Sequence, residues 1–102
     1  MDMLPEIMAA IQPYKDQVEV YVDGGIRRGT DVIKCLALGA KCVFVGRPVL
    51  FSLASEGERG IEKMFNIFEK EMKNSMMLLG AGTIKDISLK HLIKATIPKS
   101  NL

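Results

Sequence analysis

Two short runs of β-branched residues constrain the fold most, because each ends in glycine and arginine and each precedes a helix-like segment. The first run is "QVEVYV" (17–22), followed by "DGGIRRG"; the second is "KCVFVG" (41–46), followed by "RP". Short runs rich in valine and aromatic residues are typical of strands. Strands that alternate with helices indicate right-handed crossovers and a parallel sheet. We therefore predict an α/β fold.

The helical segments follow from apolar spacing and from proline and glycine signals. We predict helices from Leu4 until Pro13, from Thr30 or Asp31 to about Leu38, from Pro48 to about Ser55, and over 58–79. The longest has one apolar stripe, formed by Ile61, Met64, Phe65, Phe68, Met72, Met76 and Leu79. Gly80 and Gly82 end it, and Thr83 with Asp86 resembles a capping box for a short final helix.

Two parallel strands are too few for a finished sheet. So few helices cannot cover both faces and both edges, so the chain resembles a piece of a larger α/β architecture. We expect an exposed apolar surface where neighbouring strands belong, and hence instability or self-association.

Composition and charge exclude several classes of protein. The 102 residues are 48% hydrophobic and 25% charged, which is typical of a folded globular domain. A net charge of +2 is too small to indicate a nucleic-acid or membrane partner. Cys35 and Cys42 lack metal-site spacing and read as buried thiols of a reducing compartment. His91 is the sole histidine, so we expect no metal site, and we expect neither a signal peptide nor a transmembrane helix.

The two strand ends share a chemistry that suits an anion. Glycines let a backbone approach a ligand closely, helix starts offer N–H donors, and arginines add paired charged donors that fit phosphate oxygens. Asp23 would repel phosphate and is better suited to accept hydrogen bonds from ligand hydroxyl groups. Asp-Gly and Gly-Gly are also ordinary turn signals, so the first loop alone leaves both readings open. Two such loops together favour phosphate, as after strands 7 and 8 of (β/α)₈ barrels.

The segment "VDGGIRRGTDVIKCLALGAKCVFVGRPVLFSLASEGERGIEK" (22–63) closely resembles the FMN-dependent 2-hydroxy-acid oxidases and dehydrogenases. The resemblance runs from about Pro5 to His91. It implies the last two βα units of a (β/α)₈ TIM barrel, an incomplete barrel here, over residues 1–94, with a flexible tail over 95–102. It also implies FMN as cofactor, held by Asp23, Gly24, Gly25, Ile26 and Arg27 after the seventh strand and by Gly46 and Arg47 after the eighth. Arg28 stands where the family varies and is left out.

In the family, a histidine takes the proton of a 2-hydroxy acid such as glycolate or lactate, FMN accepts the electrons, and oxidases pass them to oxygen. That histidine belongs to a His-Gly-x-Arg-Gln-Leu-Asp segment, and this chain begins immediately beyond it, with Asp2 as a candidate for its last residue. His91 does not replace the histidine. We therefore expect no catalytic residue in this chain, and an isolated chain that is inactive.

Alternatives remain open. The chain could be a non-catalytic binding module or truncated pseudo-subunit that pairs with the missing barrel portion. It could also come from another phosphate-binding barrel, of the inosine monophosphate dehydrogenase or FMN-dependent isopentenyl diphosphate isomerase type, although "RRGTDVIK" and "GRPVLFSLASEGERG" argue against both. Ser100-Asn101-Leu102 resembles a Ser-Lys-Leu peroxisomal signal, so a peroxisomal or a cytoplasmic location is expected.

Overall fold

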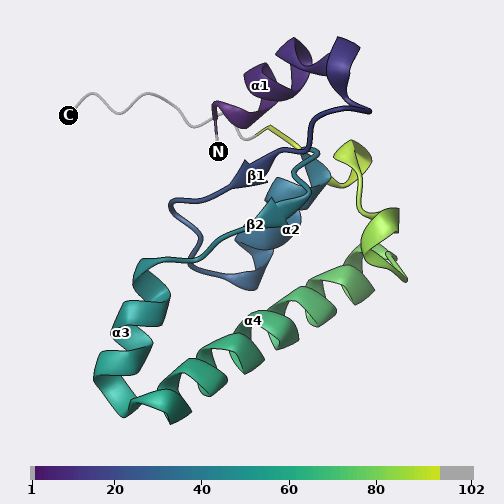
Figure 1. Cartoon of the computed structure of the whole chain (residues 1–102). Helices are drawn as coiled ribbons and strands as arrows, with labels where there is room; N and C mark the ends of the chain where they lie inside the picture. Colours follow the sequence, from purple (N-terminus) through teal and green to yellow (C-terminus); the bar gives the residue numbers. More distant parts are fainter. Residues whose placement is uncertain (1, 95–102) are drawn as a thin grey trace, which may run out of the picture.

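The computed structural model describes residues 2–94, and its elements follow the predicted order (Figure 1). The α-helices and strands are α1 (Leu4–Ala10), β1 (Tyr21–Val22), α2 (Gly29–Ala37), β2 (Cys42–Val43), α3 (Arg47–Glu56) and α4 (Glu58–Leu79). Three 3₁₀ turns accompany them: η1 (Gln12–Tyr14), η2 (Ile84–Asp86) and η3 (Leu89–His91). The predicted helices are all present, the last as short 3₁₀ turns. The predicted tail over 95–102 lies outside the described residues.

The strands are parallel, as predicted, but much shorter than predicted. Tyr21 pairs with Cys42 and Val22 with Val43. One hydrogen bond continues the ladder at each end: Lys41 N–H donates to the Val20 carbonyl and Phe44 N–H to the Val22 carbonyl, both at 2.8 Å. The strands predicted over 17–22 and 41–46 are therefore two residues each. Each strand has a single neighbour in the described chain, and residues without a ladder partner are not held as strand.

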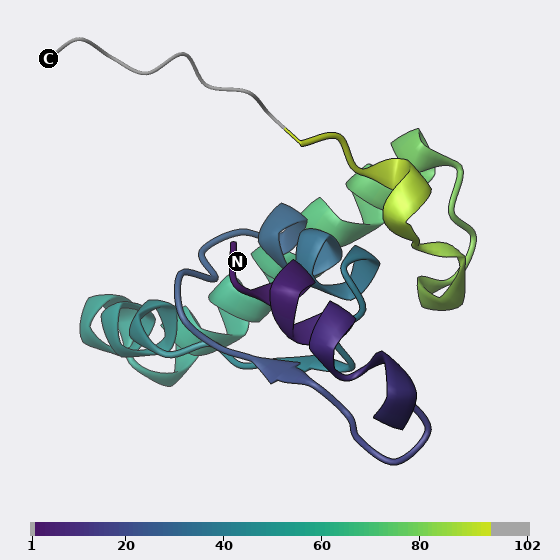
Figure 2. The same ribbon diagram turned by 90° about the horizontal axis from the view of Figure 1, so that it is seen from above.

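The two faces of this sheet differ. Val20, Val22, Val43 and Val45 pack against a core that contains Cys35, Met64 and Phe68. Figure 2 shows α2 and α4 on this side of the strands, with the opposite side open. The open face carries Tyr21 and Phe44, whose side chains are 55% and 53% exposed. Helices therefore cover only one face of the sheet in the described chain, which agrees with the expectation that so few helices cannot cover both faces.

Helix α3 leads away from the sheet, and α4 returns from the far end of α3 and packs against α2 (Figure 1). Pro48 lies in the first turn of α3, and Gly80 ends α4 in a left-handed conformation at φ 75°, both as predicted. The apolar stripe of α4 buries Met64 and Phe68, but Phe65 is 53% exposed. Of the predicted stripe, Phe65 and Leu79 are both exposed, so these two side chains do not belong to the core.

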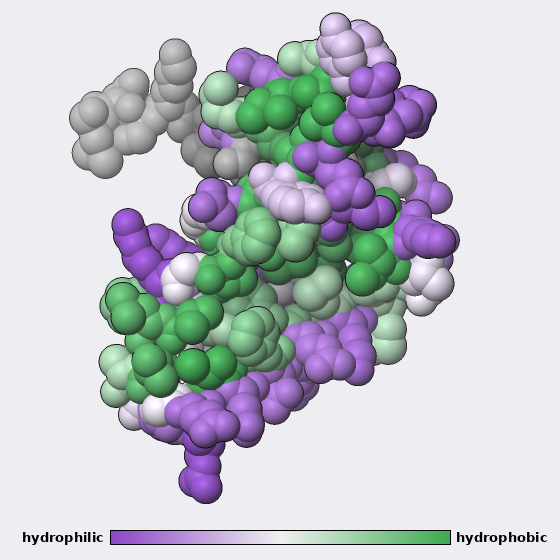
Figure 3. Space-filling model, viewed as in Figure 1, coloured by the Kyte–Doolittle hydropathy of each residue, from purple (hydrophilic) through white to green (hydrophobic). Residues whose placement is uncertain are grey.

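Apolar side chains are also exposed on α3. Leu50, Phe51 and Leu53 are each more than half exposed. Figure 3 shows hydrophobic surface gathered over the α3 end of the molecule, above the polar surface of α4. This apolar surface lies over a helix, so the exposed apolar surface predicted where neighbouring strands belong stays a prediction. Among the helices within residues 2–94, none combines the length and apolar character needed to cross a membrane.

Candidate functional site

All seven predicted site residues line one pocket, at the carboxyl ends of the two strands. Figure 1 shows both strands leading toward the same end of the sheet, where the loop before α2 and the segment before α3 lie. The pocket has a volume of about 430 Å³. Its lining comprises Asp23, Gly24, Gly25, Ile26, Arg27, Phe44, Val45, Gly46, Arg47 and Pro48. Sequence reasoning missed Phe44, Val45 and Pro48, although their position beside Gly46 and Arg47 was a usable signal.

The glycines of the first loop are required by backbone conformation. Gly24 and Gly25 have φ angles of +88° and +73°, which residues with a side chain rarely adopt. A Cβ atom at Gly24, Gly25 or Gly46 would meet no atom within 4 Å. The backbone is thus bare toward open space at three points of the pocket lining. A ligand can approach it there without meeting a side chain.

The backbone donors of this loop fall into two groups. In the part of the chain that the structure describes, the N–H groups of Gly24, Gly25 and Ile26 donate no hydrogen bond. The N–H groups of Arg27 and Arg28 both donate to Oδ2 of Asp31, each at 3.1 Å. These unpaired donors belong to residues that line the pocket, and each needs an acceptor from outside the described chain.

The starts of the two following helices differ. Arg47 and Pro48 open α3 and line the pocket, which agrees with the expectation that a helix start faces the anion. The lining from the first loop stops at Arg27, before α2 begins at Gly29. For α2 the expectation is therefore wrong. The Asp31 carboxylate lies at that helix start and already accepts hydrogen bonds from the residues before it.

The charged groups of the lining are two guanidinium groups and one carboxylate. Arg27 and Arg47 come from separate loops, and Arg28 does not line the pocket. Paired guanidinium groups and free N–H donors are the donor set that phosphate prefers, while Asp23 supplies an acceptor for hydroxyl groups. This set fits the phosphate and polyhydroxyl chain of FMN. Residues 2–94 contain no cluster of three or more histidine, cysteine or acidic side chains able to hold a metal ion.

An aromatic pair lies directly beside the pocket on the open face of the sheet. The rings of Tyr21 and Phe44 meet edge to face, with centroids 5.9 Å apart. The Tyr21 hydroxyl donates to Oε2 of Glu19 at 2.7 Å, and this hydrogen bond raises the pKa of Tyr21 above its ordinary value. Phe44 thus adds an aromatic ring to the pocket lining and contacts Tyr21.

His91 lies outside this pocket and has a structural contact of its own. Its Nδ1 accepts a hydrogen bond from Ser88 N–H at 3.2 Å, at the start of η3. Asp86 has a similar role at η2: its carboxylate accepts from Thr83 N–H at 2.9 Å, which lowers the pKa of Asp86. The structure thus gives His91 a hydrogen bond at the start of η3, away from the pocket, and confirms the predicted Thr83–Asp86 contact.

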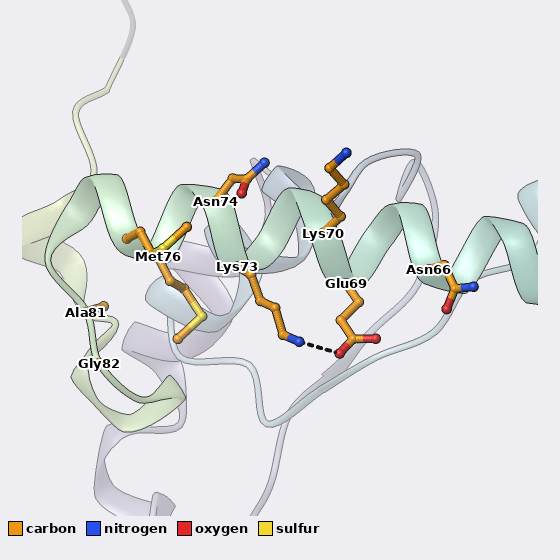
Figure 4. Close-up of a pocket in the computed structure, with 9 residues that line it drawn as sticks. Asn66, Glu69, Lys70, Lys73, Asn74, Met76, Ala81 and Gly82 are labelled. Carbon is orange, nitrogen blue, oxygen red and sulfur yellow. Dashed lines mark ion pairs between the residues drawn. The ribbon is translucent and has the colours of Figure 1, made fainter.

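A larger hollow, of about 620 Å³, lies along the C-terminal half of α4 and contains none of the predicted residues. Figure 4 shows Lys70 and Asn74 on one side of α4, with Lys73 and Glu69 on the other. Lys73 Nζ is 2.8 Å from Glu69, and this ion pair lowers the pKa of Glu69. Lys70 and Lys73 lie on different sides of α4, and Lys73 is paired with Glu69. These two lysines therefore do not form an anion-binding site.

Comparison with known proteins agrees on one family. The model of the family described as FMN-dependent dehydrogenase matches residues 1–94. The chain is 51% identical over 88 residues to 2-hydroxyacid oxidase 2 of Bos taurus, covering 86% of this chain and 24% of that protein. It is 48% identical over 89 residues to glycolate oxidase of Spinacia oleracea, covering 87% and 23%.

The solved flavin-binding domain of baker's yeast flavocytochrome b2 superposes with a TM-score of 0.83 at 39% identity, covering 94% of this chain and 27% of that one. The chain thus spans about a quarter of the length of the relatives it matches.

Proposed function

Because this chain belongs to the FMN-dependent dehydrogenase family, we propose that its pocket grips the phosphate end of FMN in an enzyme that oxidises a 2-hydroxy acid. The observation that carries this proposal is the convergence of two loops, distant in sequence, on one pocket with two guanidinium groups and unpaired N–H donors. Arg27 and Arg47 bind the phosphate, and Gly24, Gly25 and Gly46 let it approach the backbone. Asp23 accepts hydrogen bonds from the hydroxyl-bearing chain next to the phosphate.

The substrate class is a small 2-hydroxy acid, and the product is the 2-oxo acid. The names of the bovine and spinach relatives, a 2-hydroxyacid oxidase and a glycolate oxidase, support this class. FMN, when bound, accepts the electrons of the oxidation. The part of this chain in that reaction is to hold and orient the cofactor. The sequence has one histidine, His91, and its ring nitrogen is engaged at η3 away from the pocket.

We also propose that the two strand–helix units are the last two of a (β/α)₈ barrel. The open face of Tyr21 and Phe44 supports this placement, because a barrel would enclose that face. Two units of eight are a quarter of a barrel, which agrees with the quarter of each relative that the chain spans. In isolation, the open face would favour self-association or pairing with the rest of a barrel. A peroxisomal location rests on Ser100-Asn101-Leu102, which lies outside the described residues.

The proposed phosphate-binding site is tested by comparing the binding of FMN with that of riboflavin, which lacks the phosphate. We expect the purified 102-residue chain to bind FMN more tightly than riboflavin in a fluorescence titration at low salt. Arg47→Gln should weaken FMN binding about tenfold or more, the usual effect of losing one charged hydrogen-bond donor, and leave riboflavin binding unchanged. Arg28→Gln is the matched control, because Arg28 is also exposed and lies in the same loop but does not line the pocket. Equal affinities for FMN and riboflavin would contradict the proposal.

Chemistry by the isolated chain is tested separately. We expect no reduction of flavin when glycolate or lactate is added anaerobically to the FMN-loaded 102-residue chain, because no histidine lines the pocket to act as the base. The flavin absorbance measures this directly, and dithionite is the positive control for reduction. Reduction by the hydroxy acid above the rate of free FMN would show that this chain holds catalytic groups.

A further inference from the structure

Asp31 makes the two side-chain contacts that fix the first loop. Its Oδ2 accepts from the N–H groups of Arg27 and Arg28, each at 3.1 Å, and Arg28 is the residue that precedes α2. The carboxylate lies in the first turn of α2, where a negative charge is favoured by the helix dipole. One acidic side chain therefore joins the end of the loop to the start of the helix.

This contact separates the loop into an outer and an inner half. The outer half, Gly24 to Ile26, keeps its N–H groups unpaired within the described chain and lines the pocket. The inner half, Arg27 and Arg28, has its N–H groups turned onto Asp31. At Arg27 the halves meet: its backbone is held by Asp31 while the residue lines the pocket.

We infer that Asp31 is a positioning residue for the proposed phosphate-binding site. Asp31 holds the backbone of Arg27 and Arg28. It thereby orients the Arg27 guanidinium and the N–H groups of Gly24 to Ile26 toward the phosphate. It also occupies the start of α2, so that a phosphate binds to the loop and to the start of α3 instead. This inference rests on the proposed function, because it assigns a role within the same site.

Asp31 can affect FMN binding in two opposite ways, by supporting the loop or by repelling the phosphate, and the test distinguishes them. A carboxylate near a phosphate repels it, so an Asp31 that acted only by its charge would weaken FMN binding. Asp31→Asn separates the two effects, since an amide oxygen can accept the same hydrogen bonds without the charge. Asp31→Ala removes both the charge and the acceptor.

Titration of the full 102-residue chain and its variants with FMN and with riboflavin tests the inference. Asp31→Ala should weaken FMN binding about tenfold, Asp31→Asn should stay within about threefold of the wild type, and neither should change riboflavin binding. Amide hydrogen exchange measured by NMR should accelerate at Arg27 and Arg28 in Asp31→Ala only. Asp86→Ala is the matched control, because Asp86 makes the same kind of carboxylate contact with a backbone N–H, at η2 and outside the pocket.

Three results would overturn the inference. FMN binding by folded Asp31→Ala that equals the wild type would show that the loop needs no support from Asp31. Tighter FMN binding by both Asp31 variants would show that Asp31 acts by repulsion. A wild type that binds FMN no better than riboflavin would remove the proposed function and, with it, the role of Asp31. If Asp31→Ala does not fold, Asp31→Ser, whose shorter side chain places its oxygen farther from the Arg27 and Arg28 N–H groups, replaces it with the same expected loss.

Discussion

The glycines of the pocket and the glycines of the helix contacts occupy opposite environments. A Cβ atom at Gly24, Gly25 or Gly46 would meet nothing within 4 Å. At Gly29, by contrast, it would lie 2.5 Å from the Phe68 carbonyl oxygen of α4, and at Gly60 it would overlap the Ser52 carbonyl oxygen of α3. The helix glycines are needed because another backbone fills the space. The pocket glycines are bordered by empty space in this chain.

This difference shows which part of the molecule is complete. Where α2, α3 and α4 contact one another, both sides of each contact belong to this chain. Gly29 and Gly60 at these contacts therefore contribute to its stability. The pocket and the open sheet face are bounded by this chain on one side only. Substitutions at the two kinds of glycine should therefore separate stability from ligand binding.

The largest effect is expected at Gly60. Gly60→Ala forces a methyl group into the Ser52 backbone of α3 and should lower the free energy of unfolding by about 3 kcal/mol, as overpacking at a rigid contact does. Urea unfolding followed by circular dichroism measures the change. Gly82→Ala is the control, because its nearest contact would be an ordinary one, 3.6 Å from Asp86 Oδ2. Equal stabilities for the two variants would remove the distinction between the kinds of glycine.

An intermediate effect is expected at Gly25, where conformation alone opposes a side chain. Gly25→Ala should lower the free energy of unfolding by roughly 1–2 kcal/mol, because its φ of +73° is unfavourable for alanine although the space is open. Asparagine tolerates this conformation better, so Gly25→Asn should lose less in the same urea experiment. If both variants were as stable as the wild type, the left-handed conformation of Gly25 would not be required.

The comparison also shows which features the sequence could predict. Signals carried by neighbouring residues worked: Pro48 opens α3, Gly80 ends α4, and the bounds of α4 agree with the predicted 58–79. The pocket could be anticipated because the carboxyl ends of parallel strands meet at one edge of a sheet, which brings Gly25 and Gly46 together.

Features that depend on distant partners could not be predicted. The length of each strand depends on which residues find a ladder partner, so the predicted strands were too long. The close approach at Gly29 depends on how α4 lies against α2. Sequence reasoning began helix α2 at Thr30 or Asp31, and only the structure shows that it begins at Gly29 and that the Asp31 carboxylate accepts from two backbone N–H groups of the first loop.

The smallest effect on stability, and the sharpest test of the comparison, is expected at Gly46. This glycine precedes α3, has a negative φ of −106°, and has open space beside it, so Gly46→Ala should change the free energy of unfolding by less than about 1 kcal/mol. The added methyl group nevertheless lies where we place the phosphate, so FMN affinity should fall roughly tenfold. The two quantities are measured on the same protein, by urea unfolding and by FMN titration. An alanine variant with unchanged FMN affinity would mean that the phosphate does not lie in the space beside Gly46. A strongly destabilised variant would mean that Gly46, like Gly29 and Gly60, is needed for the stability of the fold.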